Sequence, residues 1–270
     1  MDRLGPFCAG IDPHPSLLHA WGLDDDLAGL EKFSRTATEA LAGYVAAVKP
    51  QSAFFERFGS RGLAVFERVI ADVAGSGTQC IVDAKRGDIG STMKAYADAF
   101  CGNGSPLAGD AVTLSPYLGL ESLRPALDLA HLTGRGVFVL ALTSNPGGPD
   151  VQHATRPGGG SVASQVVTTV SALNRDAEPL GSVGLVVGAT VGSAPQDLGL
   201  DLGGANAPLL APGFGAQGGG TADLARAFGD AIGNVLPSSS RAVLAAGPVV
   251  TALRRVAVRT AEQCAEALRP

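Results

Sequence analysis

Four charged side chains follow directly after an apolar run in the first third of the chain. The run 80–82 leads into Asp83, Lys85, Arg86 and Asp88. If the run ends a buried strand, alternation along the strand places Asp83 and Lys85 on one face. Burying charge costs several kcal/mol per ion unless the ions pair. The cluster is therefore either a structural ion pair, with Asp88 capping the helix that follows, or part of a catalytic site.

A lysine between two aspartates is expected to stay protonated, because neighbouring negative charge favours the ammonium form. This setting argues against a Schiff-base lysine, which has to be shifted toward its neutral form before it can attack a carbonyl. A fixed ammonium can instead stabilise a developing carbanion and then give it a proton. The pattern predicts proton donation to, or decarboxylation at, a carbon atom of the substrate.

The elements that must position these residues are eight short apolar segments, each typical of a buried strand. They are residues 7–11, 44–48, 78–83, 111–114, 137–142, 183–187, 208–211 and 234–237. Helical patterns separate most of them, at residues 24–43, 61–74, 91–100, 120–131, 161–174 and 249–268. Such alternation indicates a parallel α/β protein. Eight units in this length predict a (β/α)8 TIM barrel, with residues 1–270 forming one domain.

Polar side chains gather at the carboxyl ends of these strands, which is where TIM-barrel active sites lie. They are Asp12, Lys49, Asp83, Lys85, Ser144, Gln217 and Arg241. This convergence favours a catalytic site over an isolated ion pair. The glycine-rich turn 212–220 and Arg241 follow the last two strands, where backbone groups and a guanidinium can hold a phosphate. The expected substrate is therefore a phosphorylated small molecule.

Composition indicates which classes of binding partner and which cellular compartment to expect. The formal net charge is -5 and there is no basic stripe, so the chain is not expected to bind nucleic acid. Neither a signal-peptide pattern nor a long uninterrupted apolar segment is present, which predicts a cytoplasmic protein without membrane contact. The four cysteines form no C-x-x-C pair and are expected to be buried, reduced thiols. No histidine spacing predicts a metal site.

Residues 83–92 read DAKRGDIGST and resemble the D-x-K-R-x-D-I-x-x-T signature of the orotidine 5′-phosphate decarboxylase family, in its longer, type 2 branch. Further segments resemble that family in the same order along the chain, at residues 10–14, 48–51, 143–147, 212–219 and 239–241. The resemblance implies a TIM-barrel lyase that converts orotidine 5′-monophosphate to UMP and CO2, the final step of de novo UMP biosynthesis. It also implies that neither a cofactor nor a metal takes part.

The resemblance assigns roles around the reacting ring. Lys85 is implied to be the acid that protonates the carbon losing its carboxylate. Asp83 is implied to lie beside that carboxylate, stressing it and holding Lys85. Lys49 is implied to complete the charged array and to contact the ribose. Asp12 is implied to bind a ribose hydroxyl, and Ser144 to read the pyrimidine amide.

The same resemblance assigns the two remaining parts of the site. Gln217 and Arg241 are implied to hold the substrate phosphate. Asp88, Ile89 and Thr92 are implied to enter the active site of a neighbouring subunit, so the resemblance predicts a homodimer with shared active sites. The segments 144–160 and 189–206 receive no assignment beyond Ser144.

Two alternatives stay open at this point. A metal-dependent sugar-phosphate decarboxylase of the same barrel type needs a carboxylate near the end of the second strand, where this chain has Lys49. The nearest acid, Glu56, lies beyond that strand. A non-catalytic barrel that senses a nucleotide is the second alternative, and the complete charged array argues against it, because burying charges together is costly.

Overall fold

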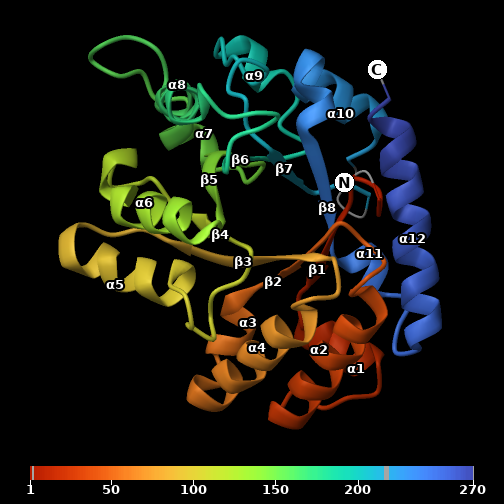
Figure 1. Ribbon diagram of the computed structural model, residues 1–270. Coiled ribbons are helices and arrows are strands. Elements are labelled where there is room, and N and C mark those ends of the chain that lie inside the picture. Colours follow the sequence, from red (N-terminus) through yellow and green to blue (C-terminus); the bar gives the residue numbers. More distant parts are fainter. Residues whose placement is uncertain (2, 216–218, 270) are drawn as a thin grey trace.

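A closed barrel of parallel strands forms the centre of the molecule (Figure 1). The computed structural model describes residues 1, 3–215 and 219–269, and over these residues it contains eight strands paired in chain order, with β8 closing on β1. The strands are β1 (Cys8–Ile11), β2 (Ala47–Pro50), β3 (Gln79–Arg86), β4 (Ala111–Leu114), β5 (Gly136–Leu142), β6 (Val183–Val187), β7 (Leu209–Pro212) and β8 (Val235–Ser239). The predicted TIM barrel is confirmed.

Helices surround this barrel, as Figure 1 shows. The long ones lie close to the predicted ranges: α2 (Leu27–Leu41), α4 (Gly59–Val73), α5 (Gly90–Cys101), α6 (Arg124–Thr133), α8 (Val162–Asn174) and α12 (Val250–Ala267). The helix predicted at 120–131 divides into a 3-10 turn, η1 (Leu120–Leu123), and α6, because Pro125 fits only the first turn of an α-helix.

Several shorter helices were not predicted, because most are too short to show a repeating apolar face. They are α1 (Pro15–Ala20), α3 (Ser52–Glu56), α7 (Gly148–Gln152), α9 (Ala194–Asp197), α10 (Thr221–Phe228) and α11 (Arg241–Leu244), with the 3-10 segment η2 (Gly229–Asn234). Most of them lie in the loops that follow strands, so they shape the end of the barrel at which the polar side chains gather. Among the described residues, no helix combines the length and the apolar character that crossing a bilayer requires.

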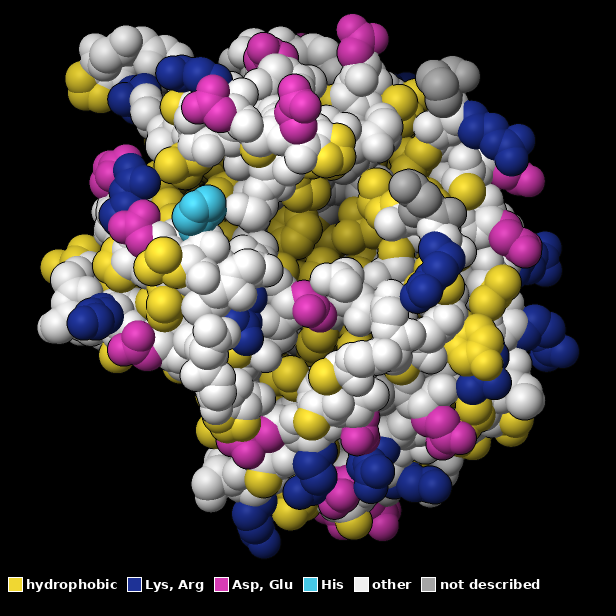
Figure 2. Space-filling view, viewed as in Figure 1, with side chains coloured by type: hydrophobic (Ala, Val, Ile, Leu, Met, Phe, Trp, Pro, Cys, Tyr) yellow, Lys and Arg dark blue, Asp and Glu magenta, His cyan; other side chains and the backbone are white. Residues whose placement is uncertain are grey.

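Two apolar layers hold the barrel together, one between strands and helices and one inside the strands. The inner layer comprises Cys8, Ala46, Ala47, Ile81, Ala111, Phe138, Val186, Leu210 and Leu236. Figure 2 shows hydrophobic side chains lining the hollow at the centre of one face. Along β3, Ile81 belongs to the inner layer and Val82 to the outer one. Strand alternation therefore returns the next side chain, Asp83, to the barrel interior above Ile81.

Several strand boundaries differ from the predicted ones by a few residues, and three of the differences place a residue of the site inside a strand. The predicted second strand, 44–48, is β2 at 47–50, because the pairing of β1 with β2 begins at Ala47. Tyr44 is instead exposed, and the guanidinium of Arg254 lies 4.0 Å above its ring. Lys49 therefore lies within a strand rather than after one. In the same way β3 extends through Lys85 to Arg86, and β8 extends to Ser239.

Candidate active site

A single buried carboxylate joins two lysines at the carboxyl ends of β2 and β3. Asp83 is 4% exposed. Its Oδ2 accepts a hydrogen bond from Lys49 Nζ at 2.5 Å, and its Oδ1 accepts one from Lys85 Nζ at 2.6 Å. The side chain of Lys49 is 8% exposed, whereas that of Lys85 is 43% exposed. The two ammonium groups therefore share one counter-ion, and only the second has a substantially exposed side chain.

Electrostatics hold the array in its charged form. Burial of Lys49 opposes its charge, but the carboxylates of Asp83 and Asp12 more than offset this effect and raise the pKa of the ammonium above its usual value. Burial likewise opposes ionisation of Asp83, yet Lys49 and Lys85 hold the pKa of its carboxyl well below the usual range. Asp83 is therefore a carboxylate, and Lys49 an ammonium, at neutral pH.

The backbone at Lys85 is unusual. Its φ is 46°, in the left-handed region that side chains other than glycine rarely adopt. The pairing of β3 with β4 shifts register between Val82 and Arg86. In this interval the Lys85 N–H donates to the hydroxyl of Thr113 at 3.0 Å, and that hydroxyl donates to Asp83 Oδ1 at 2.8 Å. The sequence did not single out Thr113, although its place one residue before the end of the fourth strand puts it beside the array.

Gln51 supports the array from the other side. It pairs with Asp83 in an isolated bridge, and its Nε2 donates to the Asp83 carbonyl at 3.1 Å. The sequence placed Gln51 in a segment with a family resemblance but gave it no role. Asp83 is thus fixed through its backbone by Gln51, the residue after β2, and through its side chain by Thr113 of β4.

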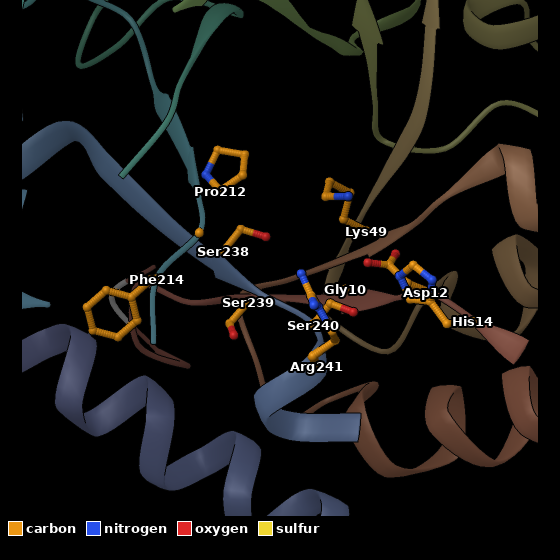
Figure 3. Close-up of a pocket in the computed structure, with 11 residues that line it drawn as sticks. Gly10, Asp12, His14, Lys49, Pro212, Phe214, Ser238, Ser239, Ser240 and Arg241 are labelled. Atoms are coloured by element: carbon orange, nitrogen blue, oxygen red, sulfur yellow. The ribbon is translucent and has the colours of Figure 1, made fainter. Parts of the chain in front are cut away.

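A pocket lies beside the array, and residues from several strand ends line it (Figure 3). Its volume is about 120 Å³, and its walls are Gly10, Asp12, His14, Lys49, Pro212, Gly213, Phe214, Ser238, Ser239, Ser240 and Arg241. Gly10 is required here, because a Cβ at this position would lie 2.6 Å from the Cβ of Ser240. Oδ1 of Asp12 and Oγ of Ser240 are buried without a hydrogen-bond partner in the described part of the chain. Such atoms at a pocket wall suit a ligand that supplies hydroxyl groups.

The wall of this pocket includes Arg241, an exposed residue at the start of α11. The structure thus brings Arg241, Asp12 and Lys49 to one cavity. Gln217, the other residue predicted to hold a phosphate, lies outside the described residues. Ser144 is exposed in the loop after β5, beside the loop after β6: its backbone nitrogen is 3.4 Å from the position that a Cβ on Gly188 would take.

The second aspartate of the motif does not reach the array within one chain. Asp88 accepts a hydrogen bond from the N–H of its neighbour Ile89 at 2.8 Å, and it neither contacts Lys85 nor caps α5. The expectation that Lys85 lies between two aspartates of its own chain is therefore wrong, and so is the helix-cap alternative. The reason is that the chain leaves the barrel after Arg86. Ile89 is 62% exposed, and Thr92 is exposed as well.

Arg86 has a structural rather than a substrate-facing position. Its guanidinium pairs with Glu56 at 2.5 Å, donates to the Ala84 carbonyl at 3.0 Å and lies 5.7 Å from the ring of Tyr96. Glu56, the acid nearest to the second strand, is thereby engaged away from the array. Within the described residues, no three His, Cys, Asp or Glu side chains are grouped so that they could hold a metal ion.

Comparisons with known proteins agree with this geometry. The model of the Orotidine 5'-phosphate decarboxylase / HUMPS family matches residues 5–256. An orotidine 5′-phosphate decarboxylase of Streptomyces coelicolor is 58% identical over 262 residues, which cover 97% of this chain and 92% of that protein. A crystal structure from Streptomyces avermitilis has a TM-score of 0.95 at 58% identity, covering 99% of this chain and 93% of that one. The structure of Leishmania donovani OMP decarboxylase has a TM-score of 0.73 at 31% identity, and the match covers 98% of this chain and 95% of that one. The chain belongs to the orotidine 5′-phosphate decarboxylase family.

Proposed function

We propose that this chain decarboxylates orotidine 5′-monophosphate to UMP and CO2, the final step of de novo UMP biosynthesis, with Lys85 as the proton donor. The reaction class is that of a carbon–carbon lyase, as for the relatives that share more than half of its residues. The observation that carries the proposal is the shared carboxylate, Asp83, which holds the Lys85 ammonium at 2.6 Å while the Lys85 side chain remains 43% exposed.

The reaction needs a stabilised carbanion and a proton. When the bond between the ring carbon and the carboxylate breaks, CO2 leaves and the electron pair stays on the ring carbon. In the proposed mechanism the Lys85 ammonium stabilises this electron pair and then transfers one N–H proton to form the new C–H bond. Lys85 becomes a neutral amine and is protonated again from solvent. Asp83 lies beside the leaving carboxylate, and like-charge repulsion there is relieved as neutral CO2 forms.

The other site residues bind the parts of the nucleotide that do not react. We assign the ribose hydroxyls to Asp12 and Lys49, the pyrimidine amide to Ser144, and the phosphate to Arg241 together with Gln217. The unpartnered Asp12 oxygen supports the ribose assignment, and the place of Arg241 on the same cavity supports the phosphate assignment. Binding energy from the phosphate end can lower the barrier at the remote ring if it drives closure over the substrate.

We further propose a homodimer in which Asp88, Ile89 and Thr92 complete the active site of the partner. Two observations support this. Ile89 and Thr92 are exposed and Asp88 is half-buried, and Ile89 is a large apolar residue that is 62% exposed shortly after β3, the strand that carries Asp83 and Lys85. An aspartate arriving from a partner would supply the second carboxylate that the motif predicts beside Lys85.

We also propose that residues 1–270 act as one domain, in the cytoplasm, without a cofactor, a metal or a nucleic-acid partner. All four cysteines are free and buried, which supports a reducing compartment. The low density of basic residues supports the expectation for nucleic acid, since Lys and Arg total 20 against 25 Asp and Glu.

The proposal is tested by incubating the purified protein with orotidine 5′-monophosphate and following the loss of its ultraviolet band. Lys85→Ala is expected to lower kcat by at least about 10²–10⁴-fold, the usual contribution of a positioned acid, while far-UV circular dichroism is unchanged. Lys32→Ala, which removes an exposed lysine from α2, is the matched control and is expected to keep wild-type turnover. Near-normal turnover of the Lys85 variant contradicts its role.

A second arm of the same assay addresses the metal-dependent alternative. Turnover is expected to be unchanged after the protein is treated with EDTA and the chelator is removed by dialysis. Loss of activity with EDTA and its return with magnesium would favour the metal-dependent sugar-phosphate enzyme instead.

A further inference from the structure

We propose that Thr113 is the positioning residue of the charged array: its hydroxyl fixes both the backbone of Lys85 and the carboxylate of Asp83. The inference deepens the proposed function, because it rests on Lys85 being the proton donor. Thr113 lies on β4, is 1% exposed and is not among the residues that line the pocket beside the array. It would act on the reaction only through the two residues that it holds.

The register of the barrel creates the need for this residue. On β3 and β4, Val82 pairs with Val112 and Arg86 pairs with Leu114. Three residues of β3, 83–85, therefore lie opposite one residue of β4, Thr113. Where three residues face one, the main-chain ladder cannot satisfy every backbone group. The Lys85 N–H finds its acceptor in the Thr113 hydroxyl instead, at 3.0 Å.

The direction of these hydrogen bonds is determined by chemistry. A hydroxyl has one hydrogen to donate and lone pairs to accept with. Because the Lys85 N–H can only donate, the Thr113 oxygen accepts it, and the hydroxyl hydrogen is free for Asp83 Oδ1 at 2.8 Å. The same Oδ1 accepts Lys85 Nζ at 2.6 Å. The three bonds close a ring that begins at the backbone nitrogen of Lys85 and ends at its own ammonium.

This ring explains how the proton donor is held although its backbone is unfavourable. Lys85 has a φ of 46°, a conformation that persists only where the surroundings impose it. Its side chain is 43% exposed, so packing alone does not fix the ammonium. Without the hydroxyl, Asp83 Oδ1 could rotate away and the Lys85 backbone could relax toward an ordinary strand conformation. Either change would move Nζ away from the reacting carbon.

The test compares two valine substitutions that remove equivalent hydroxyls. Thr113→Val keeps the shape of the side chain and removes both hydrogen bonds. Thr78→Val is the control: Thr78 is also buried, immediately precedes the same strand at its other end, accepts a hydrogen bond from Gly43 N–H and donates one to the Val45 carbonyl. Both variants are expected to lose a similar amount of thermal stability, but only the first touches the array.

The kinetic signature separates positioning from general destabilisation. We expect Thr113→Val to lower kcat by about 10²-fold, the cost of a misplacement of about 1 Å, with KM changed far less because the phosphate end is untouched. Thr113→Ser restores the hydroxyl and is expected to recover most of kcat. Thr78→Val is expected to keep the wild-type kcat. If valine at residue 113 prevents folding, Thr113→Ala removes the same hydroxyl without steric demand and the same loss is expected.

Two results overturn the inference. One is a kcat for the folded Thr113→Val or Thr113→Ala enzyme that equals that of Thr78→Val. The other is a Thr113→Ser enzyme as impaired as Thr113→Val. Both leave the proposed function intact, since wild-type protein would still decarboxylate orotidine 5′-monophosphate. If the wild-type enzyme does not decarboxylate orotidine 5′-monophosphate, the proposed function itself is contradicted. Far-UV circular dichroism together with a UMP titration establishes that each variant is folded.

Discussion

Replacing Asp83 by asparagine isolates what the shared carboxylate does for stability. The substitution keeps the size of the side chain but leaves Lys49, at 8% exposure, as a buried ammonium without its hydrogen-bonded counter-ion. Removing one partner of a buried ion pair costs about 3–5 kcal/mol, because the remaining charge is desolvated and unpaired. The ion pair between Asp83 and Lys85 contributes little to this free energy, because a partner whose side chain is 43% exposed is screened by water. We therefore expect Asp83→Asn to lower the free energy of unfolding by about 3–5 kcal/mol.

Urea unfolding at pH 7, followed by far-UV circular dichroism at one protein concentration, measures this loss. Asp72→Asn is the matched control, since Asp72 pairs with Arg35 at 3.3 Å on the surface and its loss is expected to cost less than about 1 kcal/mol. The double variant Lys49→Met with Asp83→Asn removes both buried charges. It is expected to recover most of the lost stability while remaining inactive. A loss below about 1 kcal/mol in Asp83→Asn would refute the electrostatic reasoning.

The pH dependence of the same measurement has a definite sign. Because the pKa of Asp83 is held below its usual range in the folded protein, its stabilising effect is complete above the unfolded value of about 4. It is lost as the pH falls from about 4 toward the lower folded value. The difference in stability between wild type and Asp83→Asn should therefore shrink on acidification below about pH 4. A difference that grows there contradicts the assignment of Asp83 as the counter-ion.

Three further outcomes are expected. Arg241→Ala should weaken UMP binding in calorimetry by about 2–4 kcal/mol, through loss of a charge-assisted partner, and should leave uridine binding unchanged; equal losses for both ligands contradict a phosphate role. Burial raises the pKa of the Cys8 thiol to about 12 and that of Cys101 to about 11, so native protein at pH 8 should resist a disulfide reagent until denaturant is added. Mixing inactive Lys85→Ala with inactive Asp88→Ala subunits should restore about a quarter of wild-type activity, because half of the dimers are mixed and each has one complete site; no recovery argues against a shared site.

Much of the barrel could be predicted from the sequence because its strands are apolar runs separated by helical periodicity. The strand boundaries were predicted wrongly where buried residues lie outside the hydrogen-bonded ladder. Val45 and Ala46 are buried but precede the ladder that begins at Ala47, so an apolar run alone misplaced the second strand by a few residues. The short helices of the loops have too few turns to show periodicity, and they went unpredicted for that reason.

The residues of the candidate site were likewise predicted where a local sequence pattern exists and missed where none does. Asp83 and Lys85 were predicted to meet because both charges lie at one strand end. Thr113 was not, because its importance depends on a register in which three residues face one, and such an irregularity has no periodic signature. Asp88 does not contact Lys85 of its own chain for a related reason. Its separation from Lys85 in sequence is small, but the chain turns away after the strand, so proximity along the chain does not become contact.

The unequal burial of the two lysines explains why one carboxylate needs both. If Lys85 alone neutralised Asp83, transfer of its proton to the substrate would leave a buried carboxylate with no counter-ion at the moment of reaction. Lys49 prevents this, because its ammonium stays on Oδ2 at 2.5 Å while Lys85, on Oδ1, changes charge. Its raised pKa keeps it from giving up its own proton. Burial and charge together thus suit the two lysines to different roles: the buried Lys49 keeps the carboxylate neutralised, and the more exposed Lys85 can act on the substrate.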